Sequence, residues 1–182
     1  MHDSVLAALI AAERSHTPRE RTLAVGMARE ALTRLANTEM DAAEGSDEPR
    51  EAGSIPDAIE AGARELGVDV EVARMIGRPA PLVPGRVGRA LTLAAMQAIA
   101  NAVQHADGRG LAVAVRADAK PTRVRIEVSD TGDGFNVEGM PDDRLGIRAS
   151  IVARVAAVGG TTRIASGERG TTVRLEWREP AA

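Results

Sequence analysis

Two pairs of short apolar segments, each joined by a few turn residues, restrict the possible folds of this chain more than any other feature. The first pair is LAVAVRAD and TRVRIEVSD, residues 111–118 and 122–130, on either side of Lys120-Pro121. The second pair is TTRIAS and TTVRLEW, residues 161–166 and 171–177, joined by a glycine-containing turn. Strand-like runs this close together favour β-hairpins. A sheet built from two hairpins cannot be a doubly wound parallel sheet, which needs a crossover for every strand.

The remaining pattern between residues 54 and 182 adds one strand and three helices. Residues 68–77 alternate as a strand does, and helices are predicted over residues 54–67, 83–106 and 145–160. Ser54 is the predicted N-cap of the first helix and Gly67 ends it. Five strands and three helices in this order predict an α+β fold, a two-layer α/β sandwich with a mixed sheet and its helices on one face.

An acidic segment rich in Gly, Ser and Pro, residues 41–53, divides the chain and is interpreted as a linker. Before it, residues 2–15 and 18–36 are two amphipathic helical segments. Two short helices cannot bury their apolar faces alone, so we expect a helical hairpin that dimerises into a four-helix bundle, although packing on the second domain would bury the same faces. The predicted organisation is a helical region over residues 1–40, the linker, and an α+β domain over residues 54–182.

Composition excludes several classes of function. The formal net charge is −3, and Phe135 and Trp177 are the only aromatic residues, which disfavours nucleic acid as a partner. The chain has no cysteine, so disulfides and thiol chemistry are excluded. No apolar run reaches about 18 residues, so we expect a cytoplasmic protein.

Polar residues at every fourth position mark the long helix as a candidate site. In MQAIANAVQHA, residues 96–106, Gln97, Asn101 and His105 share one stripe of an otherwise apolar helix. Packing of a mostly apolar helix does not explain such a stripe, so these three residues are candidates for a functional site.

Three glycine-containing segments complete the candidate site. SDTGDGF, residues 129–135, follows a β-branched strand, and its glycines allow the main chain to approach a ligand closely while Asp130 and Asp133 offer acceptors. A tight turn or part of a calcium-binding loop would carry the same residues. Gly146 lies where a helix is predicted to begin, and free N–H groups at a helix start favour phosphate. The third segment, residues 167–172, precedes the last predicted strand.

In this order and spacing, the motifs resemble the ATP-binding domain shared by histidine kinases, gyrase, Hsp90 and MutL, also called the GHKL or Bergerat fold. QAIANAVQHA resembles the N-box, SDTGDGF the D-x-G-x-G box, RLGIRASIVARVAAVGG the G-x-R helix, and GERGTTVRLEW the closing G-x-G-T strand. Within this superfamily the chain is similar to two-component sensor histidine kinases with a HisKA_3-type dimerisation region. The resemblance covers residues 54 to about 177.

The resemblance implies ATP and Mg²⁺ as ligands and assigns roles within the site. Asn101 would ligate the magnesium ion, Asp130 would accept a hydrogen bond from the adenine amino group, and His105 would contact phosphate or ribose, although a helix-end histidine bonded to the backbone is an equal alternative. Gly132 and Gly134 would make room for the base, Gly146 would meet the phosphates, and Thr171 or Thr172 would close the adenine end. The segment NVEGMPDD, residues 136–143, would be a mobile lid.

The resemblance also implies a phosphoacceptor at the N-terminus. HDSVLAALI is similar to the HisKA_3 phosphoacceptor box, which makes His2 the nucleophile and Asp3 its general base. A response regulator aspartate would then receive the phosphoryl group. We expect further segments of the natural protein, including a sensing region and any membrane anchor, to precede this chain.

Two departures from the family pattern affect catalysis. Ala7 replaces a glutamine associated with phosphatase activity, so we expect weak phosphatase activity. Gln97 replaces the usual N-box glutamate, and a neutral amide cannot accept a proton as a carboxylate does. Two alternatives therefore stay open beside the active kinase: a nucleotide-binding regulator without phosphoryl transfer, and a serine kinase of the anti-sigma type.

Overall fold

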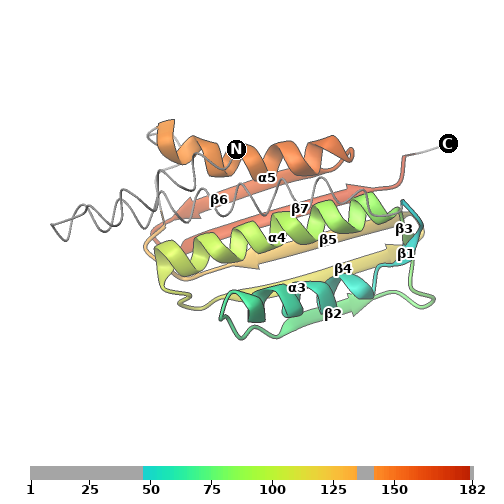
Figure 1. Ribbon diagram of the computed structural model, residues 1–182, viewed down its shortest axis with the longest axis horizontal. Coiled ribbons are helices and arrows are strands. Elements are labelled where there is room, and N and C mark those ends of the chain that lie inside the picture. Colours follow the sequence, from blue (N-terminus) through green and yellow to red (C-terminus); the bar gives the residue numbers. More distant parts are fainter. Residues whose placement is uncertain (1–46, 135–141, 181–182) are drawn as a thin grey trace, which may run out of the picture. The chain divides into compact units, whose positions relative to one another are not determined.

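The computed structural model describes residues 47–134 and 142–180, and for residues 142–149 it describes the backbone alone. One five-stranded sheet organises these residues in the order β2-β4-β5-β7-β6 (Figure 1). Its strands are β2 (Val72–Ile76), β4 (Ala112–Ala119), β5 (Thr122–Ser129), β6 (Thr161–Gly167) and β7 (Gly170–Arg178). The pairing of β2 with β4 is parallel and the other three pairings are antiparallel. The predicted mixed sheet and both predicted hairpins are confirmed.

Three helices lie on one face of this sheet (Figure 1): α3 (Ser54–Glu65), α4 (Gly85–Ala106) and α5 (Asp142–Ala157). Alternation along each strand turns one set of side chains toward the helices, where they form the core. Each fully buried aliphatic side chain contributes about 1.5–3 kcal/mol of hydrophobic stabilisation. The largest fully buried side chains of this core are Ile59, Leu91, Ile99, Ile126, Ile151 and Leu175.

Small side chains bring α4 close to the sheet. Ala94, Ala95, Ala98, Ala102 and Ala106 are all buried along the helix. A row of methyl groups leaves little distance between the helix axis and the strands, and Ala106 in the last turn lies against Gly132 in the loop after β5. The helix ends at Asp107, which adopts a left-handed conformation with φ 51°, and Gly108 follows in the predicted turn.

A second, two-stranded sheet was not predicted. β1 (Arg50–Glu51) pairs antiparallel with β3 (Leu82–Val83), and Asp47 forms an ion pair with Arg86 at the start of α4. The last residues of the predicted linker are therefore part of the folded unit. Strands of two residues carry no periodicity that a sequence pattern could reveal.

Two local predictions need correction. Gly53, not Ser54, is the N-cap of α3, and the hydroxyl of Ser54 donates to the carbonyl oxygen of Glu51 at 2.8 Å instead of capping the helix. The helix predicted from residue 145 begins at Asp142, so the last two residues of the predicted lid are helical.

Several predictions lie outside the described residues, which exclude 1–46, 135–141 and 181–182. The N-terminal helical hairpin, the dimeric four-helix bundle and most of the linker are among them and stay predictions. None of the described helices has the length and hydropathy of a membrane-spanning segment.

Candidate functional site

Asp130, directly after β5, holds two of the glycine-containing segments together. Its Oδ1 accepts hydrogen bonds from the backbone N–H of Gly132 at 2.9 Å and from the backbone N–H of Thr171 at 3.3 Å. The backbone N–H of Asp130 in turn donates to the carbonyl oxygen of Thr171 at 2.9 Å. An aspartate bonded to the main chain two residues ahead is a common turn device. Here the same carboxylate also accepts a hydrogen bond from the last strand, so two separate segments fix its orientation.

The second oxygen of Asp130 has no hydrogen-bond partner among the described residues. Both recorded hydrogen bonds of this carboxylate within the described chain go to Oδ1, and none goes to Oδ2. The side chain is half-buried. A carboxylate with one oxygen held by backbone donors presents the other as a fixed acceptor for an N–H group.

The glycines of the candidate site are required by packing within the protein itself. A Cβ at Gly132 would overlap the Cβ of Ala106, in the last turn of α4. A Cβ at Gly134, where φ is +60°, would overlap the backbone carbonyl of Gly167. At Gly170, with φ +110°, a Cβ would overlap the carbonyl of Asp130. These contacts bring the end of α4, the loop after β5 and the β6–β7 turn into one place.

On α4, two members of the predicted polar stripe contact each other. The Gln97 amide nitrogen donates to the Asn101 amide oxygen at 3.4 Å, a long hydrogen bond across one helical turn. Both side chains are half-buried, while Gln104 and His105 in the last turn are exposed. The Asn101 oxygen is thus the acceptor of the Gln97 bond and also the atom that the sequence predicts as a metal ligand.

The two threonines of the last strand face opposite sides of the sheet. Thr171 has the parity of Val173, which faces the helices, and its hydroxyl shares a 2.9 Å hydrogen bond with the hydroxyl of Ser166. Thr172 pairs with Ser129 and shares the parity of the open face. Because alternate residues of a strand point to opposite faces, Thr171 and not Thr172 lies on the side of the helix layer.

Some predicted residues cannot be placed at this site. His2 and Asp3 lie outside the described residues, so the phosphoacceptor stays a prediction. Gly146 is the fifth residue of α5, not its first, and its backbone belongs to the helix. The first four N–H groups of α5, which have no partner within the helix, belong to the helical residues that precede Gly146.

Sequence reasoning missed two residues that shape the site. Arg109 forms an ion pair of 3.2 Å with Asp133, and its carbonyl oxygen accepts the backbone N–H of Thr131 at 2.8 Å. Ser166, through its bond to Thr171, ties the two strands of the last hairpin. Each contact joins positions distant in sequence or on different strands, and no local spacing signals it.

The donor set of the site fits a nucleotide and its magnesium ion. Asp130 offers a fixed carboxylate acceptor, and Asn101 offers a neutral oxygen of the kind that hard cations accept. Among the described residues, no cluster of three acidic or histidine side chains could hold a metal ion by itself. Mg²⁺ commonly takes one or two protein ligands and completes its shell with phosphate oxygens and water, and a single asparagine suits this mode.

Comparison with known proteins gives the same family as the site. Residues 87–181, just over half of the chain, match the family described as histidine kinase-, DNA gyrase B-, and HSP90-like ATPase. A search of the curated proteins finds no significant match.

Solved structures of histidine kinases share the fold at low identity. The histidine kinase domain of the Erythrobacter litoralis EL346 blue-light activated kinase is 16% identical, with a TM-score of 0.54 over 97% of this chain and 95% of that one. The Acinetobacter baumannii histidine kinase AdeS is 13% identical, with a TM-score of 0.56 over 98% and 93%. A longer structure of the EL346 kinase matches over 89% of this chain and 51% of its own length, so the present chain spans about half of it. The chain belongs to the family of histidine kinase-, DNA gyrase B-, and HSP90-like ATPases.

Proposed function

We propose that this chain is the cytoplasmic kinase part of a sensor histidine kinase. In this proposal residues 54–182 bind ATP with Mg²⁺, and residues 1–40 form a HisKA_3-type dimerisation region joined to them by the linker. The protein transfers the γ-phosphoryl group to His2 and then to an aspartate of a response regulator.

The observation that carries the nucleotide part of the proposal is the geometry of Asp130. Its Oδ1 is occupied by two backbone N–H groups from Gly132 and Thr171, and its Oδ2 is the acceptor that remains. The adenine amino group is a donor, and a charge-assisted bond to it contributes about 1.5–3 kcal/mol. Family membership and the fold shared with histidine kinase structures support the same ligand.

The chain's own residues supply positioning in the proposed mechanism. Asp130 and Thr171 orient the base end, and Asn101 holds the metal ion, which neutralises phosphate charge when bound. His2 forms the new bond to the γ-phosphorus while the bond to the leaving ADP oxygen breaks. Asp3 orients the imidazole and accepts its proton.

A second candidate function rests on Gln97. In the structure this residue donates to the amide oxygen of Asn101, the proposed metal ligand, whereas a carboxylate at this position could act only as an acceptor there. An amide also cannot take a proton from water or imidazole. These two properties favour a regulator that binds ATP and a partner but transfers no phosphoryl group.

Labelled ATP distinguishes the candidate functions. The full chain is incubated with γ-labelled ATP and Mg²⁺, and ATP binding is measured in parallel by calorimetry. The kinase predicts label on the protein that is acid-labile and base-stable, and that disappears in His2→Ala while ATP binding is unchanged.

The other outcomes identify the alternatives. ATP binding without label supports the regulator, and acid-stable label on an added protein substrate supports the serine kinase. Label that survives His2→Ala contradicts the assignment of the phosphoacceptor. Absence of ATP binding contradicts the proposal as a whole.

A further inference from the structure

The sheet face opposite the helices carries a concentration of arginine. Alternation places six arginines and three acidic residues of β4 to β7 on this side, a formal charge of +3 in a chain whose net charge is −3. Among the described residues no helix covers this side, because all three lie on the other (Figure 1). We call it the arginine face, defined by Arg116, Arg123, Arg125, Arg163, Arg174, Arg178, Asp118, Glu127 and Glu176.

Like charges stand directly opposite each other at three places on the arginine face. Strand register pairs Arg116 with Arg125. The register also pairs Arg123 with Arg178, and Arg163 with Arg174. Like charges directly opposite each other destabilise a sheet. Carboxylates of Asp118, Glu127 and Glu176 balance part of this repulsion, and an anionic partner would balance more of it.

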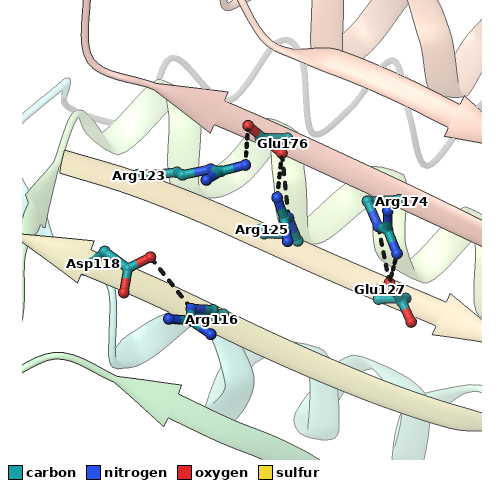
Figure 2. A network of polar contacts seen from close by, with 7 residues as sticks. All are labelled: Arg116, Asp118, Arg123, Arg125, Glu127, Arg174 and Glu176. Atoms are coloured by element: carbon teal, nitrogen blue, oxygen red, sulfur yellow. Dashed lines mark hydrogen bonds and ion pairs between the residues drawn. The ribbon is translucent and has the colours of Figure 1, made fainter. Parts of the chain in front are cut away.

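The acidic residues of the face hold several guanidinium groups in place (Figure 2). One Glu176 oxygen contacts Arg123 at 2.6 Å and the other contacts Arg125 at 3.0 Å. Arg174 donates twice to one oxygen of Glu127, at 2.7 and 2.9 Å. A guanidinium has five N–H donors, and these bonds use only part of each set. Among the described residues the Nε of Arg123 is buried with no hydrogen-bond partner, and the other unused donors belong to half-buried side chains on the sheet.

A hollow of about 180 Å³ lies on this face, lined by Arg123, Arg125, Thr161, Arg163, Arg174 and Glu176. For Arg163, and for Arg178 at the end of β7, no ion pair is recorded within the described parts of the chain. Both side chains are exposed. Around the hollow, Arg123 and Arg125 share the one carboxylate of Glu176 and Arg174 pairs with Glu127, whereas the charge of Arg163 has no such partner among the described residues.

We propose that the arginine face is a docking surface for an acidic segment of a partner protein, one with several neighbouring aspartates or glutamates. Guanidinium forks match carboxylates in a planar, two-bond geometry, and positioned forks lose little entropy on binding. Nucleic acid fits less well, because among the described residues no aromatic side chain lies on this face and Trp177 points into the core. The surface is separate from Asp130 and Asn101, so the proposal does not depend on ATP binding.

Peptide binding to the full chain tests this surface. The probe is a short fluorescein-labelled peptide of consecutive glutamates, and the same peptide with glutamines is the neutral control. Fluorescence anisotropy at low salt is expected to show binding of the glutamate peptide about tenfold tighter or more than binding of the glutamine peptide, with affinity falling as salt rises.

Charge reversal locates the site. Arg163→Glu with Arg178→Glu removes two exposed charges that hold no recorded ion pair, and is expected to weaken binding of the glutamate peptide by roughly tenfold or more. Arg64→Glu on α3 makes a charge change of the same kind on an exposed residue of the helix layer and is expected to change binding by less than about twofold. Circular dichroism melting checks that all variants are folded.

Three results would overturn the proposal. The first is equal binding of the glutamate and glutamine peptides. The second is a loss of affinity for the glutamate peptide in Arg64→Glu that is as large, for each charge reversed, as the loss in the double variant. The third is tighter binding of a single-stranded oligonucleotide than of the glutamate peptide, which would assign the face to nucleic acid.

Discussion

Replacing Asp130 with asparagine tests the adenine site with the least change in shape. The side chain keeps its volume, and the asparagine oxygen can still accept the two N–H groups of Gly132 and Thr171. Because those two donors require an oxygen at the position of Asp130 Oδ1, the new NH₂ group must take the position of Oδ2. A donor then faces the adenine amino group, which is also a donor.

The loss in affinity follows from this single exchange. A hydrogen bond to a charged group contributes about 1.5–3 kcal/mol, which corresponds to a roughly 10- to 150-fold rise in the Kd for ATP. The free energy of unfolding should change little, because both backbone bonds are kept. Asp133→Asn is the matched control, since the Asp133 side chain is 91% exposed and its contact among the described residues is a surface ion pair with Arg109.

Inosine triphosphate, which carries a carbonyl oxygen where ATP has the amino group, makes the test specific. The unchanged protein should prefer ATP, whereas Asp130→Asn should lose or invert this preference, because its NH₂ group can donate to the carbonyl. Calorimetric titration with both nucleotides measures the ratio. An unchanged ratio, or a Kd for ATP within about twofold of the original, would refute the assignment of adenine to Asp130.

Three further predictions concern stability and catalysis. Gly170→Ala should lower the free energy of unfolding by about 2 kcal/mol or more in chemical denaturation, because its Cβ would overlap the Asp130 carbonyl at φ +110°, while Gly167→Ala in the same turn meets no atom within 4 Å and is the control. Gln97→Glu should raise ATP hydrolysis at least about tenfold if a carboxylate base is what the site lacks, and unchanged hydrolysis and autophosphorylation rates would contradict that role. Hydrogen bonds from Arg123 hold the pKa of Glu176 below its ordinary value, so the bonds stabilise the fold above about pH 4.3 and are lost as the pH falls through the lowered pKa. Denaturation of Glu176→Gln should accordingly show a deficit of roughly 1–2 kcal/mol near neutral pH that shrinks as the pH falls through the lowered pKa, and a deficit independent of pH would exclude this cause.

The elements of the sheet and helices could be read from local pattern because their causes are local. Alternation of buried and half-exposed residues along β5 and β7 follows from the geometry of a single strand, and the hairpin turns lie between adjacent segments. Helix boundaries were less certain, as Ser54 and the start of α5 show, because capping depends on contacts such as the Ser54 bond to Glu51. β1 and β3 were missed because their only signal is their pairing with each other.

In the candidate site, too, contacts within one element could be predicted and contacts between distant segments could not. Gln97 and Asn101 could be placed together from their spacing alone, because residues four apart lie one helical turn apart. The contacts of Gly132 with Ala106, and of Asp130 with Thr171, join residues far apart in sequence. The resemblance to a family predicted which motifs would meet, but it could not give the atoms through which they meet.

By itself, the sequence determined the hairpins and the polar stripe of α4, since each depends on neighbours within a turn or a strand. Only the tertiary structure decided that one oxygen of Asp130 accepts two backbone N–H groups while the other has no partner among the described residues. The tertiary structure likewise decided that Thr171 rather than Thr172 faces the helix layer and shares a hydrogen bond with Ser166. It also decided the arginine face, because strand register is what sets Arg163 opposite Arg174 and Arg123 opposite Arg178. Register is a property of the assembled sheet, in which burial of one face selects the pairing, and charges on the other face follow from that selection.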